Sequence, residues 1–301
     1  MDLYATPEYA RTCAHLGTPR TLPRSGVTVL TREVPGESGW YDARAPYPLL
    51  NTQAWTALAA DLDATDDLLS FVAVIDPACT PPHAVLARVF PDRLVTFKPH
   101  HIVRLGDWPA LARVDATHRR KARRAAAHVE VEVVESPSAH AAEWVRLYAS
   151  LRARHGFGGA ADFPDTALAA QLALPGMMLV RALRDDHVVS IATWCVDGTR
   201  AHYHLGASNP AGYEVGAAYA VFAFALEELA SRGVTWVDLG GSAGVSESDD
   251  DGLTRFKRGW ASETATAWLG GRVLDADGYR TLAEGHDGSQ WFPAYRAAVA
   301  A

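Results

Sequence analysis

Apolar and polar positions along the first hundred residues follow patterns that predict a mixed α/β region. Residues 53–62 have helical spacing, because Trp55, Leu58 and Leu62 fall on one face. Short β-like runs, separated by turns that contain proline or glycine, are predicted at 27–31, 71–75, 84–90 and 94–98. Strands and a helix are therefore expected to follow one another in this part of the chain.

The middle of the chain is predicted to form helices followed by an antiparallel meander. An apolar stripe indicates a helix from 137 to about 155, and a shorter helix is expected at 163–174. Asp185-Asp186 and Asp197-Gly198 have the composition of hairpin turns. The strands of this region are expected at 129–134, 177–183, 188–196 and 201–206.

The last third of the chain returns to alternating element types. An apolar helix at 214–231, ending at Gly233, precedes a strand at 235–239, a basic turn and a final strand at 264–269. This order of strands, helices and hairpins predicts an α+β fold.

The composition restricts the partners of such a fold. The 28 lysines and arginines against 35 aspartates and glutamates give a net charge of −7, so any binding of phosphate or nucleic acid has to be local. The three cysteines lack the spacing of a metal site, and the longest apolar stretch is well short of the roughly 20 residues that span a bilayer. We expect a cytoplasmic protein with no bound metal and no membrane partner.

The segment from Thr235 to Trp260 combines a strand, a glycine turn and a basic cluster. Gly240 and Gly241, followed by Ser242, let backbone N–H groups approach a ligand closely. The basic cluster is a candidate for binding phosphate and consists of Arg255, Lys257 and Arg258. Alternatively, the cluster balances the acidic segment 247–251, which is itself either a lid over a ligand or a solvated connection.

A second basic run, HRRKARRA at 118–125, follows Asp115, which has the side chain of a helix cap. Its cationic side chains are distributed on all sides of the helix axis. They form either a solvated face or a surface for an anionic ligand, with Arg120 as the binding candidate.

The order of several motifs resembles the GNAT acyltransferase fold, and more closely its FemAB-like branch of peptidyl and aminoacyl transferases. These motifs are FKPHHIVRL at 97–105, HRRKARRA at 118–125, YHLGASNP at 203–210, VDLGG at 237–241 and GLTRFKRGW at 252–260. The resemblance implies a GNAT-like mixed sheet flanked by helices. It places the catalytic lobe at 115–301 and a smaller N-terminal GNAT-like lobe at 1–114.

The resemblance leaves the acyl donor open. CoA-dependent GNAT enzymes carry a polar residue and small residues at the start of the central helix, where N–H groups hold the pyrophosphate. Gly216 and Ala218 fit the small positions, but Tyr213 stands where the polar residue is expected. FemAB-like proteins use aminoacyl-tRNA. The expected donor is therefore aminoacyl-tRNA or acyl-CoA, with no tightly bound cofactor.

Candidate catalytic groups lie on two of the predicted strands. Asp238 either orients or deprotonates the amine, or caps a neighbouring turn. His202 and His204 share one strand face and Tyr203 lies on the other. A histidine there acts as a general base or as a structural hydrogen-bonding residue. The predicted catalytic residues are Asp238, His204 and Tyr203.

Further binding candidates come from other segments. Trp194 either walls a pocket or fills the core. The loop at 41–48, rich in tyrosine and proline, is similar to acceptor-cleft loops of the family. Asp42, Arg44 and Tyr47 are its candidates, although such a loop is also an ordinary packing device.

Three functions are consistent with the sequence. The first is transfer of an acyl or aminoacyl group to an amine of a small molecule or peptide in a biosynthetic pathway. The second is acetyl-CoA-dependent N-acetylation. The third is a GNAT-shaped protein with other chemistry, or one that serves as the partner of another biosynthetic enzyme. A tRNA donor further predicts that the basic segments 119–124 and 255–258 form one positive strip.

Overall fold

The computed structural model describes residues 3–106, 109–156, 162–242, 252–286 and 291–299. The chain divides into two compact units. The central unit comprises Lys98–Gly158 and Pro164–Ala265, and the flanking unit comprises Asp2–Phe97, Gly159–Phe163 and Thr266–Ala301. The sequence placed one boundary at 114, whereas two of the boundaries in the structure fall inside strands, namely β5 (Arg93–Arg104) and β11 (Glu263–Val273).

The flanking unit is built on strands in the order β1-β2-β3-β4-β11. β3 and β4 are parallel, and the other neighbouring pairs are antiparallel. Besides β11, its strands are β1 (Thr18–Thr21), β2 (Thr28–Val34), β3 (Glu37–Arg44) and β4 (Ser70–Ile75). The helices are α1 (Pro7–Thr12), α2 (Trp55–Asp63), α3 (His83–Val89) and α10 (Ala276–Ala283). Leu58, Phe71 and Phe90 lie in its core.

Helix α3 corrects the strand predicted at 84–90. Pro82 stands at its N-cap position, and Leu86 and Val89 are buried three residues apart. A short apolar run does not distinguish a strand from a buried helical turn by periodicity alone. The helical spacing of its buried residues fits one face of a helix against the core.

The central unit is built on strands in the order β5-β10-β9-β8-β7-β6. The remaining strands are β6 (Glu130–Val134), β7 (Met177–Arg184), β8 (His187–Asp197), β9 (Arg200–Ser208) and β10 (Trp236–Asp238). β7, β8 and β9 are antiparallel neighbours, which confirms the predicted meander, and β6 pairs antiparallel with β7. Asp185 and Asp186 adopt left-handed φ angles of 51° and 61° in the first hairpin turn.

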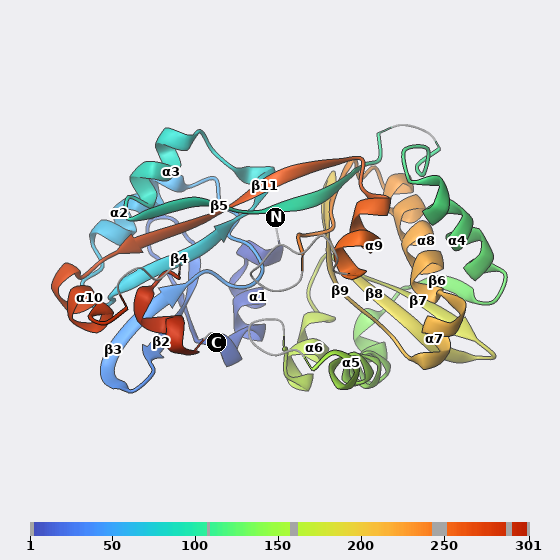
Figure 1. Cartoon of the computed structure of the whole chain (residues 1–301), viewed down its shortest axis with the longest axis horizontal. Helices are drawn as coiled ribbons and strands as arrows, with labels where there is room; N and C mark the ends of the chain where they lie inside the picture. The colour runs from blue at the N-terminus through green and yellow to red at the C-terminus, as the bar shows by residue number, and fades with distance from the viewer. Residues whose placement is uncertain (1–2, 107–108, 157–161, 243–251, 287–290, 300–301) are drawn as a thin grey trace. The chain divides into compact units, whose positions relative to one another are not determined.

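Helices cover both sides of these strands. Figure 1 shows α4 and α8 on one side of β7, β8 and β9, and α5 and α6 on the other. Trp194, Phe222 and Trp260 are fully or almost fully buried in the core on the α8 side. The helices are α4 (Ala116–Ala126), α5 (Ala141–His155), α6 (Asp165–Gln171), α7 (Pro210–Val215), α8 (Ala217–Ser231) and α9 (Gly252–Trp260). Short 3₁₀ helices lie at Leu3–Ala5, Ala14–Leu16, Pro77–Cys79, Pro137–His140 and Ala294–Val299.

Two predictions for the central unit need correction. The helix predicted at 214–231 is interrupted, because Gly216 has a left-handed φ of 69° and separates α7 from α8. The basic turn predicted at 255–258 lies inside helix α9, whose buried residues Thr254, Lys257 and Trp260 recur every three positions. The α+β fold class itself is confirmed. Within the described ranges, no helix is both long and apolar enough to cross a membrane.

Candidate active site

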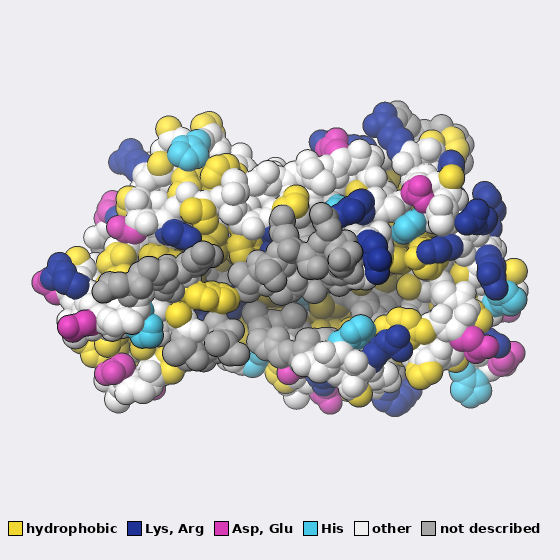
Figure 2. Space-filling model, in the orientation of Figure 1, with side chains coloured by type: hydrophobic (Ala, Val, Ile, Leu, Met, Phe, Trp, Pro, Cys, Tyr) yellow, Lys and Arg dark blue, Asp and Glu magenta, His cyan; other side chains and the backbone are white. Residues whose placement is uncertain are grey.

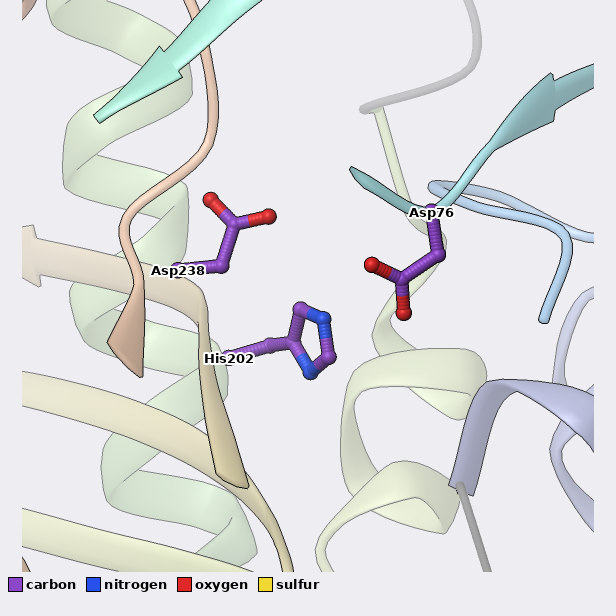
Figure 3. A group of neighbouring side chains, drawn as sticks. All are labelled: Asp76, His202 and Asp238. Carbon is purple, nitrogen blue, oxygen red and sulfur yellow. The ribbon is translucent and has the colours of Figure 1, made fainter. Parts of the chain in front are cut away.

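The parallel strands β9 and β10 pair over a short distance only. Their last paired residues are Asp238 and His202, after which β9 continues to Ser208. The chain beyond Asp238 stays with β5 instead, because Leu239 N donates to His101 O (2.9 Å) and His101 N donates to Gly240 O (3.1 Å). Figure 3 shows the side chains of His202 and Asp238 at this point, where backbone pairing between the two strands ends.

A buried histidine–aspartate pair lies at the end of β10. His100 Nδ1 and Asp238 Oδ2 are 2.7 Å apart, and the two side chains are 8% and 2% exposed. Burial by itself would raise the pKa of Asp238. The charge of His100 and its hydrogen bond, together with the charge of His202 and the hydrogen bond from Gly240 N, outweigh burial, so the pKa of Asp238 lies below its usual value. An ionised carboxylate only accepts hydrogen bonds. His100 Nδ1 therefore carries the proton, and Nε2 holds the lone pair when the ring is neutral.

Asp238 also fixes the turn that follows it. Its Oδ1 accepts a hydrogen bond from Gly240 N at 2.6 Å. This contact matches one of the two roles that the sequence left open for Asp238, the capping of a turn. A direct contact with an amine substrate stays a prediction. The Asp238 carboxylate thus fixes both the orientation of the His100 ring and the conformation of the glycine turn.

Two lysines hold the glycine turn from its carbonyl side. Lys257 Nζ donates to Gly241 O at 2.7 Å, and Lys98 Nζ donates to Ser242 O at 3.1 Å. A Cβ at Gly241 would stand 2.4 Å from Lys98 Cδ, so any larger residue would displace the Lys98 side chain. The sequence predicted that this turn and its lysine bind phosphate. The structure brings Gly240, Gly241, Ser242 and Lys257 together, and their role toward a ligand stays a prediction.

The basic cluster of α9 divides between two sides of the helix. Lys257 is 7% exposed and points inward, whereas Arg255 and Arg258 lie on the exposed side. His101 is also buried, and the charges on α9 affect its pKa. Burial lowers the pKa of His101, and the charges of Lys257 and Arg258 lower it further.

The sequence named neither His100 nor His101 as a candidate site residue. The segment 97–105 was noted only for its resemblance to the family. Adjacent histidines in a strand point to opposite faces, which was the available signal that one of them would face the interior.

Helices α4 and α9 are joined by contacts of His118 and of the N-cap residue Asp115. His118 Nε2 donates to Phe256 O at 3.1 Å, and Asp115 N donates to Gly259 O at 3.1 Å. The His118 ring also packs edge-on against Trp260, with ring centres 5.4 Å apart. The motifs at 118–125 and 252–260 therefore form one structural junction.

The exposed side chains of these two helices are strongly basic. Figure 2 shows Lys and Arg side chains over α4 and α9 in the same view. We call this the basic face. Its exposed members are Arg120, Lys121, Arg123, Arg124, Arg255 and Arg258. The segments that the sequence expected to form a positive strip thus belong to neighbouring helices of one unit.

The other predicted catalytic residues occupy two different environments. His204 Nε2 donates to Gln171 Oε1 at 3.1 Å, and burial followed by the charge of His202 lowers the pKa of His204 to about 3. Tyr203 faces the opposite side, with its ring centre 5.2 Å from that of Trp194, and burial raises its pKa. Trp194 itself is 0% exposed, so it fills the core, as one of its two predicted roles required.

The candidates from the loop at 41–48 belong to the flanking unit. Asp42 is 0% exposed and forms ion pairs with Arg32 and Arg296. The Tyr47 ring packs edge-on against Phe163, with centres 5.7 Å apart. Asp76, also labelled in Figure 3, belongs to this unit, where it accepts hydrogen bonds from Ala78 N and Asn51 Nδ2.

Comparisons with known proteins agree with this architecture. Residues 112–258 match the family model described as acetyltransferase (GNAT) domain. No curated protein matches the sequence. The crystal structure of FemX is similar with a TM-score of 0.70 and 14% identity, covering 93% of this chain and 94% of FemX.

Two further solved structures have lower TM-scores. The C-terminal domain of a putative lysylphosphatidylglycerol synthetase from Agrobacterium fabrum has a TM-score of 0.62 and 16% identity, over 92% of this chain and 89% of that chain. L-PGS from Bacillus licheniformis has a TM-score of 0.57 and 12% identity, over 91% and 94%. At these identities the likeness establishes a shared fold.

Proposed function

Since residues 112–258 form an acetyltransferase (GNAT) domain and the chain is accordingly a GNAT-type acyltransferase, we propose that it transfers an aminoacyl group from aminoacyl-tRNA to an amine of a small molecule or peptide. The observation that carries the proposal is the buried His100–Asp238 pair at the end of β10, next to the glycine turn held by Lys257. Together they provide a proton acceptor and a positive charge for amide formation.

The proposed role of His100 is to accept a proton from the attacking amine. Most aliphatic amines are protonated at neutral pH and are nucleophilic only as the free base. With Nδ1–H directed to Asp238, the ring accepts a proton at Nε2. The imidazolium ion that forms keeps its Nδ1–H hydrogen bond to the Asp238 carboxylate.

The proposed role of Lys257 is electrostatic. The amine nitrogen attacks the ester carbonyl of the donor, a C–N bond forms, and negative charge develops on the carbonyl oxygen. Lys257 places its ammonium group beside the Gly240-Gly241 turn, where a hydrogen bond to Gly241 O fixes it. Collapse of the intermediate breaks the ester C–O bond. The ribose oxygen of the tRNA leaves and takes up a proton, for which His100 is the donor.

The basic face supports a nucleic-acid donor. A chain with a net charge of −7 does not attract polyanions as a whole. Clustered arginines on α4 and α9 nonetheless present guanidinium groups to phosphodiesters locally. The proteins of similar fold include FemX, a putative lysylphosphatidylglycerol synthetase and L-PGS, which is in keeping with an aminoacyl donor.

Acetyl-CoA is the second candidate donor, favoured by the matched acetyltransferase family model. The backbone before α8 argues against it. Gly212 N donates to Asn209 Oδ1 (2.9 Å), Tyr213 N to Asn209 O (3.0 Å) and Gly216 N to Tyr213 O (3.2 Å). N–H groups that are already hydrogen-bonded inside α7 are poor ligands for a pyrophosphate.

Incubation with charged tRNAs tests the proposal. Purified protein is mixed with tRNAs carrying isotope-labelled amino acids and with a panel of amines, and labelled amides are sought by mass spectrometry. We expect amide from aminoacyl-tRNA and none from acyl-CoAs. Amide from acyl-CoA alone would favour the second function. Product only after addition of a stoichiometric partner enzyme would favour an accessory role.

A matched pair of histidine variants connects the result to the site. His100→Gln should abolish most of the turnover, whereas His128→Gln, at an exposed position of the same unit, should leave it unchanged. Equal activity of the two variants would remove His100 from the mechanism.

A further inference from the structure

The two histidines of β5 face opposite sides of the central unit. His100 and His101 are adjacent in the strand, so their side chains alternate between its two faces. His100 is on the face that meets Asp238. His101 shares its face with Val103, which is buried in the same core as Trp260 of α9. His101 therefore lies on the side of β5 toward α9, away from the His100–Asp238 pair.

His101 and Lys257 meet at the glycine turn. His101 N donates to Gly240 O at 3.1 Å, and a Cβ at Gly240 would stand 3.2 Å from Lys257 Nζ. Lys257 and Trp260 are three positions apart on the buried face of α9, so the lysine comes from the side on which His101 lies. All of these residues belong to the central unit. The imidazole and the ammonium group thus approach one turn from the same side.

The His101 ring is a buried polar group without a protein partner. Its side chain is 5% exposed, and its Nδ1 is buried with no hydrogen-bond partner among the described residues. Nearly all buried polar atoms of native proteins are hydrogen-bonded, so this exception calls for a reason such as a role toward a ligand. Burial, and next the charges of Lys257 and Arg258, lower the pKa of His101. The charge of His100 lowers this pKa further, and that of Asp238 opposes the shift. At neutral pH the ring is therefore uncharged, with one N–H and one lone pair.

We propose that a ring N–H of His101 donates to the carbonyl oxygen of the acyl donor and, together with Lys257, stabilises the negative charge that develops there. A donor that is fixed before the reaction and aimed at developing charge lowers the barrier without reorganising during the step. The two faces of β5 then divide the work, because His100 serves the amine on one face and His101 the carbonyl oxygen on the other. No bond to His101 forms or breaks, and its proton stays on the ring. The identity of this oxygen rests on the proposed acyl-transfer function.

Steady-state kinetics of the full-length protein with aminoacyl-tRNA test the role of His101. His101→Leu should lower kcat by about 10²–10³-fold and leave KM for the donor unchanged, as expected when a group that acts only in the transition state is lost. His101→Asn and His101→Gln place an amide N–H near the positions of Nδ1 and Nε2, respectively. One of these two variants should recover much of the lost rate and so identify the nitrogen that donates. The control His128→Leu, at an exposed position of the same unit, should have the kcat of the wild type.

Thermal melting separates this role from a structural one. Tm of His101→Leu should equal or exceed that of the wild type, because the change removes a buried polar atom that has no partner. Wild-type kcat in His101→Leu, a rise in KM alone, a rate loss that neither amide variant relieves, or a lower Tm in all three variants would overturn the proposal. Amide formed only from acyl-CoA would refute the tRNA donor, and the same kinetics with acyl-CoA would then decide the role of His101. Absence of transfer from every donor would refute the proposed function and the role of His101 with it.

Discussion

Gly259 lies so close to His118 that no side chain fits between them. A Cβ at position 259 would stand 2.0 Å from His118 Cε1 and 2.2 Å from Nδ1. His118 is held in place by its hydrogen bond to Phe256 O on the same helix as Gly259 and by contact with the Tyr219 ring, whose centre is 5.1 Å away. The glycine of α9 and the histidine of α4 are thus required together, and their contact sets how the helix that carries Lys257 docks.

Gly259→Ala should destabilise the protein by about 1–3 kcal/mol, since an added methyl group forces the buried imidazole or the helix to move. Urea denaturation measures the loss. Gly252→Ala on the same helix is the control, because nothing lies within 4 Å of a Cβ there. Adding His118→Ala to Gly259→Ala should cost less than the sum of the single changes. Strict additivity would show that the two residues do not interact.

The Asp238→Asn variant should lower kcat/KM for acyl transfer by about 10²–10⁴-fold, the usual contribution of general acid–base catalysis. An amide at 238 presents a donor to His100 Nδ1 and so favours the ring tautomer with the proton on Nε2. The rate should fall while the affinity for tRNA stays the same. A variant with normal kcat and weakened tRNA binding would assign Asp238 to the donor site instead.

The His204 environment predicts a loss of stability in acid. Its pKa falls from an ordinary 6.5 to about 3 in the folded protein, so between these values the unfolded chain binds more protons. Stability should therefore decrease as pH falls from 6.5, by up to about 1.4 kcal/mol per unit. The contribution is fully retained above pH 6.5. Urea unfolding at pH 7, 5.5 and 4.5 measures the slope, and His204→Gln should flatten it. NMR titration showing a His204 ring that protonates near pH 6 would contradict the assignment.

Local chemistry explains which features the sequence predicted. Asp115 caps α4 through Thr117 N, as its position before the basic run indicated, and Asp185-Asp186 form their hairpin turn. The resemblance to the GNAT fold, which relied on the order of short motifs, is confirmed by the family model that matches residues 112–258, and FemX shares the fold. These signals act within a few residues of each other or survive as patterns along the chain.

Long-range pairing explains what the sequence did not predict. His100 and Asp238 are 138 residues apart, and no local motif around either residue predicts their pairing. Asp42, proposed for an acceptor cleft, pairs with Arg296, 254 residues away. The inward direction of the Lys257 side chain depends on segment 252–260 being a helix, and its glycines made a turn the expected structure. Such contacts depend on how the elements pack, and a single sequence does not record that packing.

The basic face predicts salt-dependent binding of tRNA. Each arginine that contacts a phosphate displaces a condensed counterion, so the logarithm of the affinity falls with the logarithm of the salt concentration. Reversing two charges with Arg120→Glu and Arg124→Glu should reduce the magnitude of this slope by about 1–2 and weaken binding about tenfold or more at 0.1 M salt. Fluorescence anisotropy with labelled tRNA between 50 and 300 mM salt, about the range over which such contacts weaken steeply, measures both. The control Arg88→Glu with Arg280→Glu makes the same change in net charge at exposed positions of the flanking unit. If net charge rather than the α4–α9 surface governs the association, the two double variants will have equal slopes. Equal slopes would therefore exclude the basic face as the donor-binding surface.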